Sequence, residues 1–246
     1  MDYEQTTEML FSRHRSVQSA GFSAEAYKPG LDAMLDYARQ LGGPQERFRS
    51  IHVAGTNGKG SVCSMLAAAL AASGLRAGLY TSPHLLDFRE RMKIVQPSGG
   101  GLQTENHGRP WPCEREGPNR QVGRDERSEV HPSEDLPLTA AMIPREAVCE
   151  FIERHDRDGL TFFEVTTGMA FKWFADSGVD VAVIETGLGG LLDSTNIITP
   201  QISIITSIGL DHCGLLGNTR AGIAFQKAGI FNFGGGYAMI SLLQNE

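Results

Sequence analysis

Apolar and polar positions recur with a helical period near the start of the chain and with a strand-like pattern soon after it. Apolar side chains fall every three or four positions in 31–41, which predicts an amphipathic helix that the Gly-Gly-Pro stretch 42–44 ends. A short β-prone run, 51–54, then precedes a glycine-rich stretch, 55–60. The Ala-rich stretch 61–75 predicts a buried helix. A strand, a loop and a helix are therefore expected in that order.

Three further β-prone runs extend this pattern, at 77–81, 179–185 and 202–208. The run 179–185 is nearly continuous in β-branched residues, which is typical of a strand buried on both faces. Helices are expected at 147–154 and 166–175. The spacing is that of βαβ units with right-handed crossovers, so we predict an α/β fold with a doubly wound, mainly parallel sheet of the P-loop type.

The segment 96–137 breaks the pattern. Its 42 residues contain six glycines, six prolines and only five large apolar residues. So little apolar surface does not offset the entropy lost on ordering that much chain, so we expect a disordered insertion. The ranges 1–95 and 138–246 are then expected to form one domain. After Ile230 one short apolar run can supply a final strand, and no second domain is expected.

Charge and cysteine usage narrow the possible partners and the setting. The net charge is −7, with 22 Lys and Arg against 29 Asp and Glu, which argues against a nucleic-acid partner. The four cysteines lie far apart, at positions 63, 113, 149 and 213, which indicates a reducing compartment. We see neither an N-terminal signal peptide nor an apolar run of about 18 residues. We expect a cytoplasmic monomer without a membrane partner.

The glycine-rich stretch predicts a phosphate site because it lies between a strand and a helix. Glycines allow consecutive backbone N–H groups to point inward, and the start of the helix adds partial positive charge. Lys59 supplies a point charge for the β and γ phosphates of ATP. The alternative is a plain glycine turn with a solvated lysine. The candidate nucleotide-binding residues are Thr56, Asn57, Gly58, Lys59, Gly60 and Ser61.

A carboxylate is expected on the same edge of the sheet. Glu185 ends the most buried predicted strand, and α/β sheets bind their ligands outside the carboxyl ends of the strands. Without further evidence, a carboxylate at the end of a strand is a helix cap or a surface charge as often as it is a ligand-binding group. Glu185 is therefore one candidate for a ligand-binding residue at this edge of the sheet.

Five motifs, in this order, resemble the folylpolyglutamate synthase/dihydrofolate synthase family. The likeness covers most of 28–95 and 143–230, and the glycine that follows Lys59 is closer to the folate ligases than to the related Mur ligases. The resemblance implies a Mur-ligase-like central domain. It also implies a ligase that uses ATP and Mg²⁺ to join L-glutamate to a folate or dihydropteroate carboxylate through an acyl phosphate. The motifs are 52–61, 81–85, 185–190, 192–196 and 209–212.

The resemblance also assigns roles to individual residues. It implies that Ser82, Glu185 and His212 bind Mg²⁺, and that Lys227 matches a lysine that the family carbamylates. Lys59, Glu185, His212 and Lys227 would then be the catalytic residues. The substrate-binding residues would be Thr161, Phe162, Phe163, Glu164, Leu192, Asp193 and Ser194.

Each assignment has a plainer alternative. Ser82 can be a turn serine, His212 a structural histidine, and Lys227 a helix C-terminal lysine beside a glycine cap. Two adjacent phenylalanines, Phe162 and Phe163, are commonly core residues.

Three departures from the family pattern accompany the resemblance. Leu191 stands where the family usually has arginine, and Gln226 where it has glutamate. The chain also ends before the second α/β domain of the family. The first hypothesis is a folate–glutamate ligase, and the alternative is a truncated remnant that binds Mg-ATP without ligase turnover. A P-loop NTPase unrelated to the ligases is disfavoured by the motifs at 81–85 and 185–190.

Overall fold

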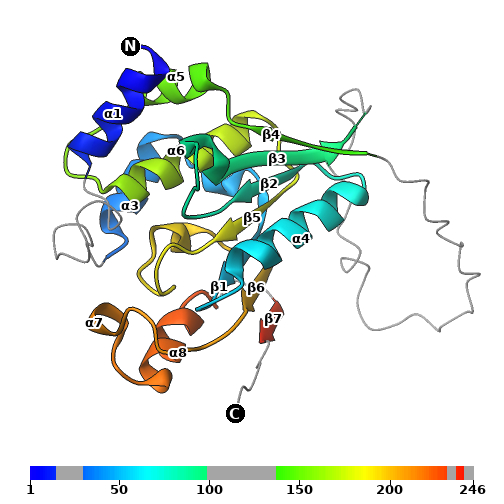
Figure 1. Ribbon diagram of the computed structural model, residues 1–246, viewed down its shortest axis with the longest axis vertical. Coiled ribbons are helices and arrows are strands. Elements are labelled where there is room, and N and C mark those ends of the chain that lie inside the picture. Colours follow the sequence, from blue (N-terminus) through cyan, green and yellow to red (C-terminus); the bar gives the residue numbers. More distant parts are fainter. Residues whose placement is uncertain (15–29, 99–136, 232–236, 241–246) are drawn as a thin grey trace, which may run out of the picture.

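A computed structural model describes residues 1–14, 30–98 and 137–231, together with the backbone of 237–240 (Figure 1). The strands form one seven-stranded sheet, and the helices cover both of its faces. The strands are β1 (Arg49–Ala54), β2 (Ala77–Tyr80), β3 (Met92–Pro97), β4 (Leu138–Met142), β5 (Val181–Glu185), β6 (Ile202–Ile205) and β7 (Tyr237–Ile240). The α-helices are α1 (Tyr3–Arg13), α3 (Asp32–Gln40), α4 (Lys59–Ala72), α5 (Arg145–His155), α6 (Phe162–Asp176), α7 (Cys213–Leu216) and α8 (Arg220–Ala228). Short 3-10 helices are η1 (Pro44–Glu46), η2 (Phe88–Arg91) and η4 (Ser194–Ile197).

The strand order is β4-β3-β2-β5-β1-β6-β7. Strands β2, β5, β1, β6 and β7 run parallel, while β3 is antiparallel to both β2 and β4. This confirms the predicted α/β class with a mainly parallel sheet. The order places β5 and β1 in the middle, where strands are buried on both faces.

The antiparallel strands β3 and β4 were not predicted from the sequence. Gln96 and Pro97 pair with Thr139 and Leu138, so the predicted boundary of the disordered segment at Gln96 lies inside β3. The pairing uses backbone groups at one edge of the sheet and needs little apolar surface, as the exposure of β4 shows. The rest of the predicted insertion, 99–136, lies outside the described residues.

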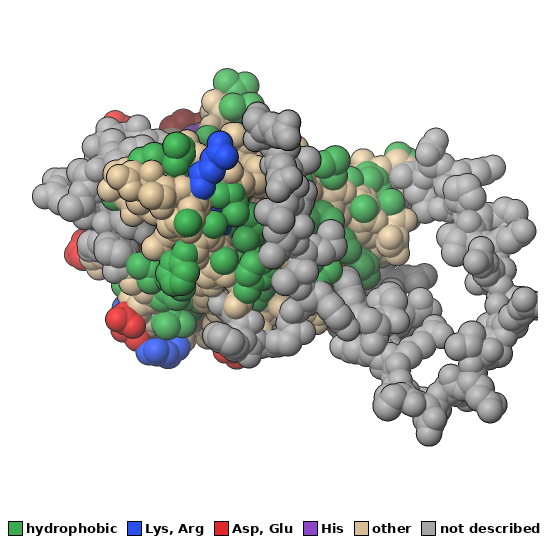
Figure 2. Space-filling model, turned by 90° about the horizontal axis from the view of Figure 1, so that it is seen from below, with side chains coloured by type: hydrophobic (Ala, Val, Ile, Leu, Met, Phe, Trp, Pro, Cys, Tyr) green, Lys and Arg blue, Asp and Glu red, His purple; other side chains and the backbone are tan. Residues whose placement is uncertain are grey.

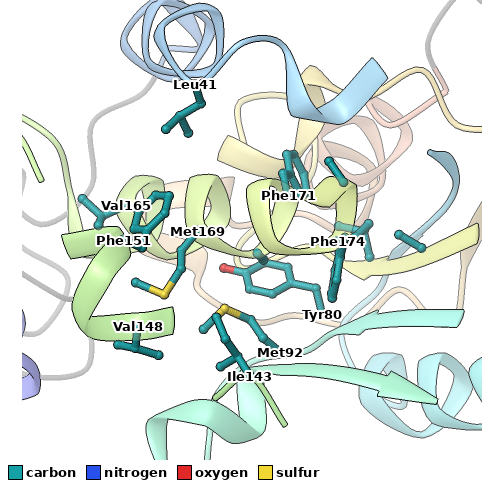
Figure 3. Close-up of a cluster of buried hydrophobic side chains, with 14 of the residues drawn as sticks. Leu41, Tyr80, Met92, Ile143, Val148, Phe151, Val165, Met169, Phe171 and Phe174 are labelled. Atoms are coloured by element: carbon teal, nitrogen blue, oxygen red, sulfur yellow. The ribbon is translucent and has the colours of Figure 1, made fainter. Parts of the chain in front are cut away.

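Alternating side chains of β5 supply two separate cores. Val181 and Val183 pack with the small residues of α4 on one face, whereas Ala182 and Ile184 face α6 on the other. In Figure 3 the second core surrounds α6, with Met169, Phe171 and Phe174 packed among neighbouring elements. The helix lies close to the sheet, because a Cβ on Gly78 of β2 would be 3.1 Å from the Phe174 ring.

Helix α1 was also not predicted, since it buries only Thr6 and Leu10. A close polar contact holds its C-terminal end, where His14 Nε2 lies 2.5 Å from the buried Asp156 carboxylate. The Nδ1 atom of the same histidine lies 2.9 Å from the Leu160 carbonyl. Contacts with distant residues, more than its own periodicity, therefore locate α1.

The face at the α7 and α8 end of the molecule carries more hydrophobic than charged side chains where it is described (Figure 2). Leu210 and Phe225 are among the exposed large hydrophobic residues, at 60% and 68%. No helix in the described ranges combines the length and apolar character needed to cross a membrane.

Candidate phosphate and substrate site

The glycine-rich loop joins β1 to α4, as expected. Gly55 has φ 153°, and a Cβ there would lie 1.9 Å from Thr206 Oγ1, so only glycine fits. Gly58, with φ 83°, is the N-cap of α4 in the left-handed region. The loop therefore delivers the first residues of α4, Lys59 and Gly60, to the carboxyl end of the sheet.

Residues that follow β6 hold the loop from outside. The Thr56 N–H donates to the Ser207 carbonyl (2.9 Å), and the Asn57 N–H donates to Ser207 Oγ (3.0 Å). Thr206 Oγ1 donates to the Asn57 carbonyl at 2.7 Å. Because these partners are about 150 positions away in the sequence, the loop's shape depends on the assembled sheet.

Lys59 lies over its own loop rather than in bulk solvent. Its Nζ donates to the Gly55 carbonyl at 3.1 Å and lies 3.9 Å from Glu185 Oε1, and its side chain is 18% exposed. Glu185 Oε2 accepts the Ser82 N–H at 3.0 Å. Burial raises the pKa of the Glu185 carboxyl, while the Ser82 N–H and Lys59 oppose that rise. The structure thus brings Lys59, Ser82 and Glu185 together.

Lys227 belongs to the same electrostatic neighbourhood. It is 4% exposed, and burial lowers its pKa to about 8, with Lys59 adding to the effect and Asp211 and Asp193 opposing it. It also precedes the C-cap, Gly229, as the plainer alternative supposed. An amine with this pKa is partly neutral near pH 7, which is what carbamylation requires.

His212 is the N-cap of the short helix α7 and has φ 49°, a left-handed conformation. Its Nε2 lies 3.4 Å from Asp211 Oδ2. The structure places it in the loop after β6, which also braces the phosphate loop, as Gly209 donates to Thr56 Oγ1.

The donor set fits a lightly held magnesium ion. Within the ranges that the structure describes, no group of three or more His, Cys, Asp or Glu side chains could hold a metal ion. Mg²⁺ is usually bound by one or two carboxylates, with water and substrate phosphates completing its shell. The buried carboxylate of Glu185 beside the phosphate loop meets that need.

The first predicted substrate segment, 161–164, begins α6. Thr161 Oγ1 accepts the Glu164 N–H (3.2 Å), and Glu164 Oε2 accepts the Thr161 N–H (2.6 Å), which is a capping box. Phe162 is buried and stacks on Phe11, with ring centroids 5.0 Å apart. Three of the four residues therefore have structural contacts of their own.

The fourth residue, Phe163, joins the two predicted substrate segments. A Cβ on Gly187 would lie 2.5 Å from its ring, so the ring presses against the loop after β5. Leu192 and Ser194 in that loop are partly exposed, and Asp193 between them is buried. Asp193 Oδ2 accepts the Leu188 N–H at 2.7 Å, and Oδ1 accepts the Thr195 N–H and hydroxyl at 3.0 and 2.5 Å.

The same loop rests on the end of α8. A Cβ on Gly190 would lie 2.8 Å from the Lys227 carbonyl, and the Leu191 N–H donates to the Gln226 carbonyl at 2.7 Å. The two positions that depart from the family pattern, Leu191 and Gln226, therefore meet through their backbones.

Sequence reasoning missed one cation near the site. Arg91 is 2% exposed, its Nε donates to His84 Nδ1 at 2.8 Å, and Glu185 is among the groups that keep its pKa from falling further on burial. An arginine directly before an apolar run was the available signal, but β3 itself was not predicted.

No protein-family model matches the chain. The chain is 40% identical over 203 residues to "Probable dihydrofolate synthetase" of Schizosaccharomyces pombe, which covers 82% of this chain and 40% of that protein. It is 38% identical over 202 residues to "Folylpolyglutamate synthase" of Lacticaseibacillus casei, covering 82% of this chain and 39% of the relative. The chain thus spans about 40% of the length of these curated relatives.

Solved structures show the same relationship. The "apo form of L. casei FPGS" has a TM-score of 0.69 at 32% identity and covers 99% of this chain and 49% of its own. "E.coli FolC in complex with DHPP and ADP" has a TM-score of 0.67 at 29% identity, covering 94% and 44%. By sequence and by fold, the chain is a relative of the folylpolyglutamate synthase/dihydrofolate synthase family.

Proposed function

We propose that this chain is the ATP-binding part of an ATP-dependent ligase that adds L-glutamate to a folate or dihydropteroate carboxylate. The observation that carries the proposal is the position of Lys59, at the start of α4 and 3.9 Å from the buried Glu185 carboxylate. A cation and a helix N-terminus stabilise the charge of a transferring phosphoryl group, and a carboxylate can hold the Mg²⁺ that accompanies it.

The chemistry follows from the weakness of a carboxylate as an electrophile. A substrate carboxylate oxygen attacks the γ phosphorus of ATP, and the bond to the β-phosphate oxygen breaks to release ADP. The amine of L-glutamate then attacks the acyl carbon, and inorganic phosphate leaves as the amide forms. Catalysis of the first step is chiefly positioning and charge neutralisation, which the residues 56–61 supply.

Ser82, Glu185 and His212 are the residues that we propose to hold Mg²⁺. The ion would neutralise developing charge on the phosphate oxygens when it is bound. Glu185 is already oriented for this role by the Ser82 N–H. Burial raises the pKa of its carboxyl although Lys59 and Arg91 oppose the rise, so a bound cation would favour its ionised form.

We place the flat ring of the substrate between the start of α6 and the loop after β5. Support comes from the contact of Phe163 with Gly187, which joins the two segments, and from the partly exposed Leu192 and Ser194. One related structure is named "FPGS-AMPPCP-folate complex", with a TM-score of 0.68 at 31% identity. Nucleotide and folate are thus held together in that relative.

The proposal includes a cytoplasmic monomer that acts on small molecules. Acidic net charge supports the absence of a nucleic-acid partner. Cys63, Cys149 and Cys213, the cysteines in the described part of the chain, are free thiols, which supports a reducing compartment.

Phosphate release tests this function against the alternative, a remnant that binds Mg-ATP without ligase turnover. Purified protein with ATP and Mg²⁺ is expected to release phosphate only when L-glutamate and either dihydropteroate or tetrahydrofolate are both present. Tight ATP binding with no such turnover would favour the remnant. The Lys59→Ala variant is the control for a contaminating ATPase.

A further inference from the structure

A histidine lies in the centre of the sheet with one ring nitrogen unsatisfied. His52, in β1 between β5 and β6, is fully buried. Its Nδ1 has no hydrogen-bond partner among the described residues. A buried acceptor without a partner destabilises the folded state, and a phenylalanine or leucine would fill this position without that cost. The benefit of histidine here must come from the other ring nitrogen, Nε2.

The Nε2 atom begins a buried chain of hydrogen bonds. It lies 2.8 Å from Thr195 Oγ1, and the Thr195 hydroxyl donates to Asp193 Oδ1 at 2.5 Å. A hydroxyl has a single proton. Because Thr195 gives that proton to Asp193, His52 must donate its Nε2–H to Thr195, which leaves Nδ1 bare. The tautomer therefore explains the unsatisfied atom.

This series of hydrogen bonds ends at the loop after β5, which is part of the proposed substrate site. The carboxylate of Asp193 accepts the Leu188 N–H at 2.7 Å, in the glycine-rich stretch directly after Glu185. That stretch presses against Phe163 at Gly187 and against the backbone of Lys227 at Gly190. A small shift of this stretch would therefore displace both Phe163, in the proposed substrate segment, and the backbone of Lys227.

We propose that His52 is a positioning residue. Its Nε2–H donates to the Thr195 hydroxyl, so that this hydroxyl donates to Asp193, and these bonds hold the loop 187–193 in the conformation that binds substrate. The effect of His52 on substrate binding rests on the function proposed above. The effect of His52 on the hydrogen bonds of the loop 187–193 does not. A donor that fixes a hydroxyl rotor strengthens the next bond in the chain, because linked hydrogen bonds polarise one another.

Amide hydrogen exchange of the full 246-residue chain tests the structural part. His52→Phe keeps a ring in the core and removes the donor. We expect the Leu188 and Thr195 amides to exchange about 2- to 10-fold faster, the effect of one lost hydrogen bond, with the Tm unchanged or raised. His52→Gln keeps an N–H near the position of Nε2 and is expected to restore slow exchange.

Thr6→Val is the matched control, because it removes a buried hydroxyl that donates to the Asp2 carbonyl, far from this loop. It should lower the Tm and leave the Leu188 and Thr195 amides unchanged. Exchange in His52→Phe equal to wild type would overturn the proposal. So would a uniform rise over the whole chain, or an equal effect in His52→Gln, since either marks a general loss of stability.

Calorimetric titration separates this proposal from the proposed function. With AMPPCP and Mg²⁺ present, His52→Phe is expected to bind tetrahydrofolate or dihydropteroate about 2- to 10-fold more weakly, with unchanged nucleotide affinity and rescue in His52→Gln. If wild type binds neither pterin compound, the proposed function fails while the exchange result still decides the role of His52. If it binds them and His52→Phe binds equally well, the positioning role is refuted and the function stands.

Discussion

The phosphate loop at 55–60 and the helix start at 161–164 differ in what satisfies their polar groups. Thr206 and Ser207, which follow another strand, brace the phosphate loop, and Lys59 lies across it 3.9 Å from Glu185. At 161–164 the polar groups satisfy each other, because Thr161 and Glu164 form a capping box. In the phosphate loop the distant segment satisfies the backbone, so we expect the Lys59 ammonium to be available to a ligand. At 161–164 the polar side chains are used to stabilise the start of α6.

The largest effect is expected at the phosphate loop. Lys59→Ala removes the cation that we propose to face the phosphates, together with its contacts to the Gly55 and Thr56 carbonyls and its 3.9 Å ion pair with Glu185. We expect ATP affinity to fall by about 100-fold or more, since several charge-assisted hydrogen bonds are lost, with little change in Tm. Calorimetry with AMPPCP measures this.

Lys172→Ala provides the matched control, because that lysine pairs with Asp176 on the far end of α6. Its ATP affinity should equal that of wild type. Unchanged affinity in Lys59→Ala would remove the phosphate-loop assignment.

The second prediction concerns Lys227, which shares the neighbourhood of Lys59. Its pKa in the folded state is about 8, below the ordinary 10.5, so the folded state disfavours the ammonium form. Stability that is present above pH 10.5 is therefore lost as the pH falls through 8. Lys227→Met should raise the free energy of unfolding at pH 7 by about 3 kcal/mol and have little effect above pH 10.5.

Urea unfolding at pH 7 and above pH 10.5 measures the difference. An equal effect of Lys227→Met at both pH values would show that its amine titrates normally. Lys93→Met, on β3, serves as a lysine control away from the loop after β5.

The elements that the sequence predicted well are those whose own pattern determines them. The run at 179–185 contains β5, and its β-branched residues face two cores, so neither face leaves the assignment open. The strands β3 and β4 escaped prediction because β4 is exposed throughout and depends on backbone pairing across a long insertion. Periodicity carries no information about such a pairing.

The candidate site shows the same division. Lys59 was predictable because a strand, glycines and a helix start surround it in the sequence. Its bracing by Thr206 and Ser207 was not, since the partners lie about 150 residues away. His52 and Arg91 were missed for a related reason, because only the folded sheet places them beside Thr195 and His84.

The third prediction moves to the self-contained motif. Thr161→Ala removes the side chain that caps α6 and leaves the Glu164 N–H without its acceptor. The free energy of unfolding is expected to fall by about 1–2 kcal/mol, while AMPPCP affinity stays at the wild-type value. Thermal unfolding and calorimetry together test this, and Thr161→Ser should restore the stability.

A loss of nucleotide affinity in folded Thr161→Ala would contradict the contrast between the two regions. The cap at 161 would then act on the phosphate loop, and the contact of Phe163 with Gly187, which joins the start of α6 to the loop after β5, would be the first place to look for the connection.

The smallest effect tests the bracing itself. Ser207→Ala removes the hydroxyl that accepts the Asn57 N–H at 3.0 Å, but leaves the Ser207 carbonyl to accept the Thr56 N–H. The Ser207 carbonyl and the Thr206 hydroxyl still hold the loop, so it should keep its shape while Asn57 becomes more mobile. We expect AMPPCP affinity to fall by only about 2- to 5-fold, the effect of one neutral hydrogen bond.

Thr206→Val should act in the same direction, because Thr206 Oγ1 donates to the Asn57 carbonyl. If the two substitutions together weaken binding by more than the product of their separate effects, the braces act as one unit, and the shape of the phosphate loop is set by the strand end that follows β6.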